Sequence, residues 1–285
     1  MRVRAAGDPK KEEFDTWTLN IGNRMNHDGR VSIPKSMFTK IIPNSKEYPK
    51  NEEISMKKFC EKVFPDLKNN LIVPGWLEGS AILAPTNREI DSLNSIIQER
   101  ITGKGIVLLS ADTLENPGDV LRFNTEYLNT LRPNGFPQHK LHLKPSMPLM
   151  VLRNINPRQG LCNGTRVIFD KCIGNKLLQC RIVETNEVVL ILRITFIPKA
   201  NKYPFKWQQR QYPVSPAFAI TINKAQGHTL KQAGILLRGD VYTHGQLYVA
   251  CSRVSDPDNL HFAIMEVSSE NSLSVIKMSF MKKFF

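Results

Sequence analysis

The amino-acid sequence predicts an α/β protein in which a parallel-sheet domain is interrupted by a small antiparallel β-barrel. Residues 80–102 and 217–265 alternate buried strands with helices, the unit from which parallel sheets are built. Between them, residues 139–212 contain short β-rich segments joined by turns, which is typical of a small barrel. The length of 285 residues exceeds what one core usually needs, so we expect two compact parts.

The first 75 residues are expected to form helices joined by irregular chain. Two sets of residues recur at helical spacing: Phe14, Trp17, Thr18 and Ile21, and then Ile54, Phe59, Val63 and Phe64. Gly22 is expected to end the first helix. Pro34 and Pro43 lie between the two sets and favour irregular structure there.

Residues 80–102 carry the clearest strand–turn–helix pattern. The apolar run Ala81–Ala84 predicts a buried strand. Thr86, followed three residues later by Glu89, has the form of a capping box that begins a helix. Apolar residues at helical spacing continue that helix, which is expected to end at Gly103.

The next stretch, residues 103–138, is expected to be a connection with a strand near Ile106–Leu109. In the segment that follows, strands are expected near residues 149–152, 167–169, 177–183 and 188–197. The pair Asn163-Gly164 predicts a two-residue hairpin. We therefore expect residues 139–212 to form a compact β insert.

This insert is strongly basic, with thirteen lysines and arginines against three carboxylates, a net +10 of the chain's +13. Near its end, aromatic residues are interleaved with cations: Tyr203, Phe205, Trp207 and Tyr212 lie among Lys202, Lys206 and Arg210. Such an arrangement is what a single-stranded nucleic-acid site requires, although some of the rings are expected in the core. The alternative reading is a solvated basic face.

The stretch "AFAITINKAQGHTL", residues 217–230, begins as a buried strand and turns abruptly polar. In α/β sheets, ligands bind at the carboxyl ends of the strands, where this loop is expected to lie. Lys224 and the backbone of Gly227 could face phosphate oxygens, and Thr221 and Gln226 could add hydrogen bonds. The alternative reading is a solvated loop.

A helix is expected from His244 to Val254, because Leu247, Ala250, Cys251 and Val254 share one face. Arg253 lies on a different face. An arginine held by a rigid helix can stabilise the charge that builds on a transferring phosphoryl group. A surface arginine without such a role is the alternative.

Composition excludes several classes of protein. No apolar run has the length of a membrane span, and the chain does not open on a signal-peptide pattern, so we expect no membrane partner and a cytosolic or nuclear protein. The five cysteines show no C-x-x-C spacing, so neither a metal site nor a disulfide framework is expected.

Residues 80–265 resemble the C-terminal half of a PIF-type, superfamily-one DNA helicase, most closely the Helitron transposon version. The stretches that carry the resemblance occur in family order: "AILAPTNREIDSLN", the Ser110-x-Asp112 segment, "GFPQHKLHLKPSMPLMVLRNINPRQGLCNGTRV", "RQYPVSPAFAITINKAQGHTL" and "HGQLYVACSRV". The opening "MRVR" resembles a stretch near the end of the family's first motor domain, so the chain is expected to begin inside a longer protein.

The resemblance implies two RecA-like motor domains with ATP and Mg²⁺ held mainly by the first. Residues 1–75 would be the end of that first domain and a linker. Residues 76–138 and 213–267 would form the second motor domain, residues 139–212 a β-barrel of the Src-homology-three type, and 268–285 a tail. The resemblance also implies 5′-to-3′ movement of a monomer on single-stranded DNA, roles in repair, recombination and telomere maintenance, and a nuclear location, with the mitochondrion as an alternative.

Residue roles follow from the same resemblance. Arg253 would be the arginine finger that reaches the γ-phosphate. Lys224, Gln226 and Gly227 would couple the nucleotide to the DNA strand, and Arg2 would be a further nucleotide contact. Thr86, Asn87, Thr221 and His228 are expected to contact DNA, together with Lys206, Trp207 and Arg210 of the insert.

The sequence also departs from the family pattern. It contains no G-x-x-x-x-G-K-[ST] motif, because Gln98 stands where the first glycine would precede Gly103-Lys104, and it has no Asp-Glu pair for magnesium. The family usually has serine at Ala225 and glutamine at His228, and Cys251 is a further departure. Two hypotheses remain: the second motor half of an ATP-dependent helicase that is inactive without its partner domain, or a non-catalytic nucleic-acid-binding remnant of a transposon helicase.

Overall fold

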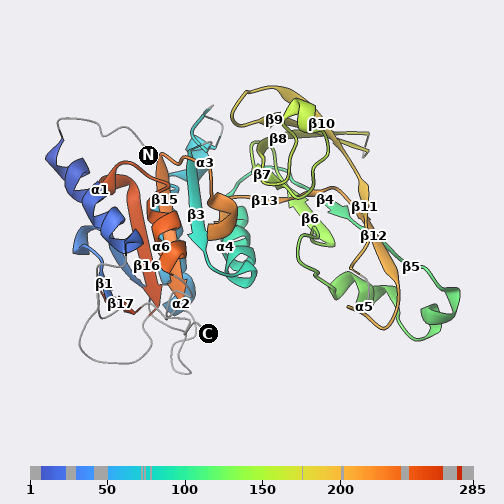
Figure 1. Ribbon diagram of the computed structural model, residues 1–285. Coiled ribbons are helices and arrows are strands. Elements are labelled where there is room, and N and C mark those ends of the chain that lie inside the picture. The colour runs from blue at the N-terminus through green and yellow to red at the C-terminus, as the bar shows by residue number, and fades with distance from the viewer. Residues whose placement is uncertain are drawn as a thin grey trace. The chain divides into compact units, whose positions relative to one another are not determined.

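The computed structural model describes residues 8–23, 30–41, 51–71, 73, 75–77, 79–174, 176–199, 202–238, 244–265 and 275–277. The chain divides into two compact units. Unit 1 combines Met1–Ile101 with Phe218–Phe285, and unit 2 is Thr102–Ala217. Figure 1 shows the ribbon of each unit.

Unit 1 is built on a five-stranded sheet in which every neighbouring pair is parallel (Figure 1). Its strands, in spatial order, are β14 (Ala219–Thr221), β3 (Ser80–Ala84), β15 (Gln232–Arg238), β16 (Leu260–Met265) and β2 (Phe38–Ile41). β3 is buried along its whole length, as its unbroken apolar run predicts for a central parallel strand. The predicted parallel-sheet domain is therefore confirmed.

Helices pack on this sheet. The helices of unit 1 are α1 (Pro9–Gly22), α2 (Asn51–Val63), α3 (Leu67–Asn70), α4 (Asn87–Arg100) and α6 (His244–Cys251), with the 3₁₀ turns η1 (Lys35–Met37), η4 (Ile222–Ala225) and η5 (Pro257–Asn259). A short pair, β1 (Arg30–Ser32) with β17 (Val275–Lys277), completes the unit. The helices expected in the first 75 residues are confirmed by α1 and α2.

The contact between α2 and the sheet depends on a glycine. A Cβ atom added to Gly234 of β15 would lie 2.5 Å from Val63 Cγ2 and 2.8 Å from Phe59 Cζ. Only a residue without a side chain therefore lets α2 approach β15 so closely.

Unit 2 is an antiparallel β structure in three sheets. The largest contains β10 (Val188–Leu192), β9 (Leu177–Ile182), β8 (Arg166–Ile173), β7 (Pro148–Val151) and β13 (Val214–Pro216), in that order. The others are β11 (Ile194–Phe196), β12 (Trp207–Gln211) and β5 (Ala111–Leu114), and the pair β4 (Ile106–Leu109) with β6 (Lys140–Leu143). Three short helical segments join them: η2 (Pro117–Leu121), α5 (Thr125–Thr130) and η3 (Pro157–Gln159).

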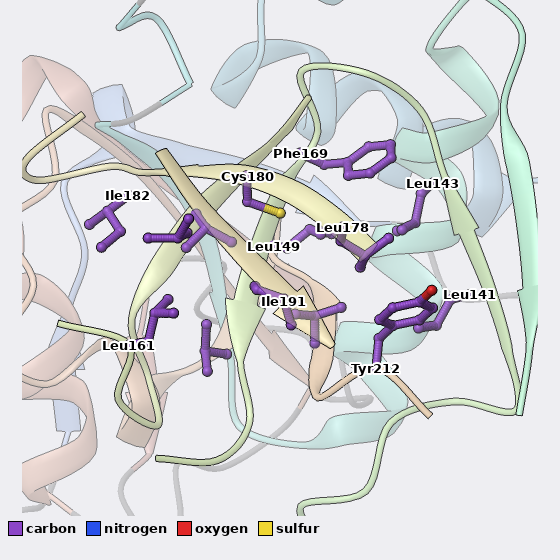
Figure 2. Packing of buried hydrophobic residues seen from close by; sticks show 14 of the residues in the cluster. Leu141, Leu143, Leu149, Leu161, Phe169, Leu178, Cys180, Ile182, Ile191 and Tyr212 are labelled. Carbon is purple, nitrogen blue, oxygen red and sulfur yellow. The ribbon is translucent and has the colours of Figure 1, made fainter. Parts of the chain in front are cut away.

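The main core of unit 2 lies between the largest sheet and the β4–β6 pair. Figure 2 shows side chains from β6, β7, β8, β9 and β10 pointing toward one another, with Tyr212 beside Leu141. Phe169, Leu178 and Ile191 are at most 2% exposed. Alternation of buried and exposed residues along β9 and β10 produces this one-sided core.

Three details differ from the sequence-based expectations. The stretch between Pro34 and Pro43 was expected to be irregular, but it contains β2, which pairs with β16 in the sheet of unit 1. Residues 102–138 join unit 2, since β4 pairs with β6 and β5 pairs with β12. Asn163-Gly164 does lie in a turn, closed by a hydrogen bond from Thr165 N to Cys162 O (3.1 Å), but the predicted two-residue hairpin is wrong. The strands that pair there are β7 and β8, and a longer connection containing η3 joins them.

Candidate functional site

Two neighbouring strands of unit 1 end at the same edge of the sheet. Thr221, the last residue of β14, lies beside Ala84, the last residue of β3. Because the strands are parallel, the chain leaves both at their carboxyl ends, where α/β folds bind ligands. Four predicted site residues follow directly: Thr86 and Asn87 after β3, and Lys224 and Gln226 after β14.

At the end of β3, Thr86 begins α4 with the predicted capping box, which is confirmed. The Thr86 hydroxyl donates to Glu89 Oε2 (2.8 Å) and accepts from Glu89 N (3.4 Å), while Thr86 N donates to Glu89 Oε2 (3.1 Å). The hydroxyl is thus engaged within its own helix turn. Asn87, the next residue, is exposed at the start of α4.

A residue that sequence reasoning missed holds β14 in place. Asn94 of α4 is buried, and its side-chain amide donates to Ala219 O (3.1 Å) and accepts from Ala219 N (2.9 Å). These bonds satisfy the backbone of β14 at the edge of the sheet. The sequence signal that could have identified Asn94 is its position as a polar residue on the otherwise apolar face of the helix.

The polar loop after β14 is a tight turn with a buried inner side. Ile222 and Ala225 of η4 are at most 1% exposed, whereas Gln226 and Gly227 are exposed. Gly227 adopts a φ of +91°, which glycine reaches without the strain that a Cβ atom would bring. Two backbone N–H groups of the loop are used within the turn itself: Gln226 N donates to Asn223 O (3.4 Å) and His228 N donates to Ala225 O (3.1 Å).

Lys224 lies half-buried in this loop. Burial lowers the pKa of its ammonium group below the ordinary value of 10.5. It forms no ion pair with any residue that the structure describes. A partly desolvated cation without a countercharge favours an anionic ligand.

Arg253 joins this loop to α6, which packs against η4. The helix expected to reach Val254 ends earlier, at Cys251, so Arg253 lies in the turn that follows α6 and not on the helix itself. Its Nη1 donates to His228 O (3.2 Å) in the loop, and its Nε donates to Val249 O (2.7 Å) in the helix. Nη2 donates to Ser252 Oγ (2.7 Å), and Leu230 N donates to Arg253 O (2.9 Å). The structure therefore brings together the two predicted elements of the site, although 25 residues separate them along the chain.

The departures from the family pattern have structural explanations. Ala225 and Cys251 are both 0% exposed and pack in the core, where a serine hydroxyl at position 225 would need a buried partner. Burial raises the pKa of the Cys251 thiol, so it stays protonated. His228 contributes its carbonyl oxygen to Arg253. Arg2 lies outside the described residues.

In unit 2 the predicted DNA contacts divide into exposed and buried residues. Lys206 and Arg210 are exposed, and Arg210 lies on β12 opposite the exposed Thr195 and Ala111. Trp207 is only 2% exposed and packs with Leu128 and Phe205. Its ring has no face available for a base, so the expected stacking role of Trp207 does not fit this structure.

A serine, a histidine and an aspartate also meet in unit 2, but not as a catalytic triad. Ser110 Oγ lies 2.7 Å from His139 Nδ1, and Asp112 Oδ2 lies 3.8 Å from the same nitrogen. A triad needs the hydroxyl and the carboxylate on opposite ring nitrogens. Burial raises the pKa of Asp112, which faces Gln209 across the β5–β12 pair. Among the described residues, no group of three metal-binding side chains comes together.

Comparisons with known proteins agree with this architecture. The family model described as "DNA helicase Pif1, 2B domain" matches residues 126–170. The ATP-dependent DNA helicase PIF1 of Homo sapiens is 34% identical over 147 residues, which cover 49% of this chain and 22% of that protein. ATP-dependent DNA helicase Pif1 of Bdellovibrio bacteriovorus is 28% identical over 135 residues, which cover 47% of this chain and 30% of that protein.

Two solved structures share the fold. The Pif1 helicase from Candida albicans gives a TM-score of 0.54 at 20% identity and covers 90% of this chain and 53% of its own. The Pif1 helicase from Bacteroides in complex with ADP-AlF3 and ssDNA gives a TM-score of 0.53 at 16% identity, and the match covers 92% of this chain and 50% of that structure.

Taken together, these matches show that part of this chain is similar in sequence to Pif1 DNA helicases and that its fold resembles theirs. The chain spans about a fifth of the length of the vertebrate relatives it matches and about half of the solved structures. In the part of the chain that the structure describes, every helix is too short or too polar to cross a membrane.

Proposed function

We propose that this chain is the C-terminal motor half of a Pif1-type ATP-dependent DNA helicase that moves 5′ to 3′ on single-stranded DNA. The observation that carries the proposal is the hydrogen bond from Arg253 to the loop that holds Lys224 (Nη1 to His228 O, 3.2 Å). It ties two cationic side chains into one rigid element at the ligand-binding edge of a parallel sheet. Of the helicases similar to this chain, the Helitron transposon version is the one we favour.

In this proposal, Arg253 is the arginine finger directed at the γ-phosphate of ATP. Lys224 supplies a second positive charge, and Gln226 and the backbone of Gly227 add hydrogen bonds at the same place. Arg2 is a further proposed nucleotide contact. When bound, ATP with Mg²⁺ supplies the phosphoryl group whose developing charge such cations stabilise.

DNA is proposed to contact the exposed side of the same loop in unit 1 and, as a separate set of contacts, basic residues of unit 2. In this proposal Thr221, His228 and Asn87 contact the strand, and Thr86, which forms the capping box of α4, orients Asn87. Lys206 and Arg210 contribute charge to phosphates without reading sequence. We propose that the β insert is a barrel of the Src-homology-three type, and that the protein acts in the nucleus.

The printed sequence has no P-loop motif and no magnesium-binding Asp-Glu pair. Without a lysine and a backbone cradle for the β- and γ-phosphates, phosphoryl transfer lacks its main parts. We therefore propose that hydrolysis needs a first motor domain and that this chain is inactive without one.

The lack of a P-loop motif and of an Asp-Glu pair in this sequence also supports a second candidate function. In that case the chain is a non-catalytic remnant that only binds single-stranded nucleic acid. The two are separated by Arg253→Ala in the longest natural product of the gene that contains this chain. The helicase proposal expects DNA-stimulated ATP hydrolysis that falls at least 10³-fold in the variant, the range for an arginine finger, with a much smaller fall in DNA affinity, because Asn87, Lys206 and Arg210 are unchanged. Lack of hydrolysis in the unaltered product, with DNA binding intact, would favour the remnant.

A further inference from the structure

The largest sheet of unit 2 ends in an open strand, β10. Ile182 N donates to Glu187 O (2.9 Å), and the pairing of β10 with β9 continues from there. Hydrogen-bonded and non-hydrogen-bonded pairs alternate in an antiparallel ladder. Val189 and Ile191 therefore bond to β9, whereas Val188, Leu190 and Leu192 direct their backbone N–H and C=O groups away from the sheet.

Those three residues form an apolar and unpaired edge. Their backbone groups make no hydrogen bond to any described residue, and Val188, Leu190 and Leu192 are 61%, 51% and 58% exposed. β10 carries neither a charge nor a proline. The opposite edge, β13, is only three residues long and ends in Pro216. A short strand and a proline protect the β13 edge of the sheet from pairing with another strand, whereas the β10 edge is open to such pairing.

We propose that β10 pairs with β10 of a second copy of this chain, antiparallel about a two-fold axis at Leu190. In that register Leu190 faces its own counterpart and Val188 faces Leu192, so apolar side chains meet along the whole strand. Each of the three pairs exchanges two backbone hydrogen bonds. Glu187 then lies opposite Arg193 in the register at both ends. Because the Arg193 guanidinium donates to Leu109 O (2.6 Å) and lies over the Tyr212 ring, the contact rests mainly on the self-complementary apolar edge that a two-fold interface needs.

Neighbouring registers fit less well. An axis at Val189 leaves Leu192 opposite Asn186, and an axis at Ile191 leaves Val188 opposite Ile194. Both also separate Glu187 from Arg193. The register at Leu190 alone pairs all three open residues with one another.

Two strands of five residues bury little area, so the dimer is weak and depends on concentration. This proposed dimer differs from the monomer that the sequence resemblance led us to expect. The inference does not use the nucleotide or DNA site, so it stands or falls independently of the proposed function.

The test is sedimentation velocity of the DNA-free chain over a concentration series. The unaltered chain is expected to form a dimer at the upper concentrations. Leu190→Lys and Leu190→Glu are each expected to weaken dimerisation at least tenfold, because like charges then face each other across the axis. An equimolar mixture of the two variants is expected to restore a dimer, because opposite charges then meet.

Ile173→Lys is the matched control, since Ile173 is 40% exposed on β8, two strands from the open edge. It should leave the dimerisation constant unchanged, and circular dichroism confirms that each variant is folded. A monomer at every concentration overturns the proposal, as does a dimer that Leu190→Lys leaves intact. Failure of the mixed variants to re-associate excludes the register at Leu190.

Discussion

Removal of the Arg253 guanidinium should loosen the whole candidate site. In Arg253→Ala, the carbonyl oxygens of Val249 and His228 lose their charged donor, and so does Ser252 Oγ. A hydrogen bond to a charged group contributes about 1.5–3 kcal/mol when buried, but Arg253 is half-buried and water replaces part of what is lost. We therefore expect a total loss of about 2 kcal/mol in the free energy of unfolding of unit 1.

For a domain of this size, a loss of about 2 kcal/mol lowers the melting temperature by about 4–8 °C. Differential scanning calorimetry measures the shift, with Arg210→Ala as a control, because Arg210 is exposed in unit 2. Hydrogen exchange should rise in residues 222–230 and at the end of α6 together, because Arg253 links them. An unchanged melting temperature, or faster exchange in only one of the two segments, would refute the reasoning that Arg253 holds the loop to the helix.

Three further predictions concern stability. Thr86→Ala should lower the free energy of unfolding of unit 1 by about 1 kcal/mol through loss of the capping box, while Thr86→Ser should not, as read by urea denaturation. Lys224→Met should stabilise unit 1 at pH 7, because burial disfavours the charged lysine, and the gain should shrink as pH rises through the lowered pKa of Lys224; a constant gain would contradict this. The pKa of Asp112 is raised, so its neutral form favours folding, and unit 2 should lose stability as pH rises from 3.8 through the raised pKa. Asp112→Asn should remove most of this pH dependence, as measured by urea denaturation at several pH values.

The parts of the fold with strong periodic signals were predictable. The buried run before Pro85 and the capping box at Thr86 each specify one local structure, and the structure confirms both. The apolar face around Leu247 did predict α6, but not its end at Cys251. The position of the polar loop beside the end of β3 followed from the rule that ligand sites lie at the carboxyl ends of strands, whereas its contact with Arg253 joins residues 25 apart and no local pattern predicted it. Each of these signals depends on neighbours that are close in sequence.

Other features were not predictable, because the local pattern of polar and apolar residues gives no signal for them or predicts a different structure. In β12 both faces are largely polar, so nothing in "WQQRQ" shows that Trp207, Gln209 and Gln211 point inward. The hydrogen bonds of Asn94 to Ala219 join residues 125 positions apart. Asn163-Gly164 does form a turn, but the turn lies within the longer connection between β7 and β8 and does not by itself join two paired strands. These outcomes depend on packing between segments that are distant in sequence.

The central claim is that this chain is a motor half that grips single-stranded DNA, and a binding titration tests it most directly. The chain is titrated against fluorescently labelled single-stranded and duplex DNA of equal length at several salt concentrations. The account predicts tighter binding of the single strand, with the logarithm of the association constant falling by about 0.7 per phosphate contact for each tenfold rise in salt. Equal affinity for both forms, or no binding at low salt, would contradict it.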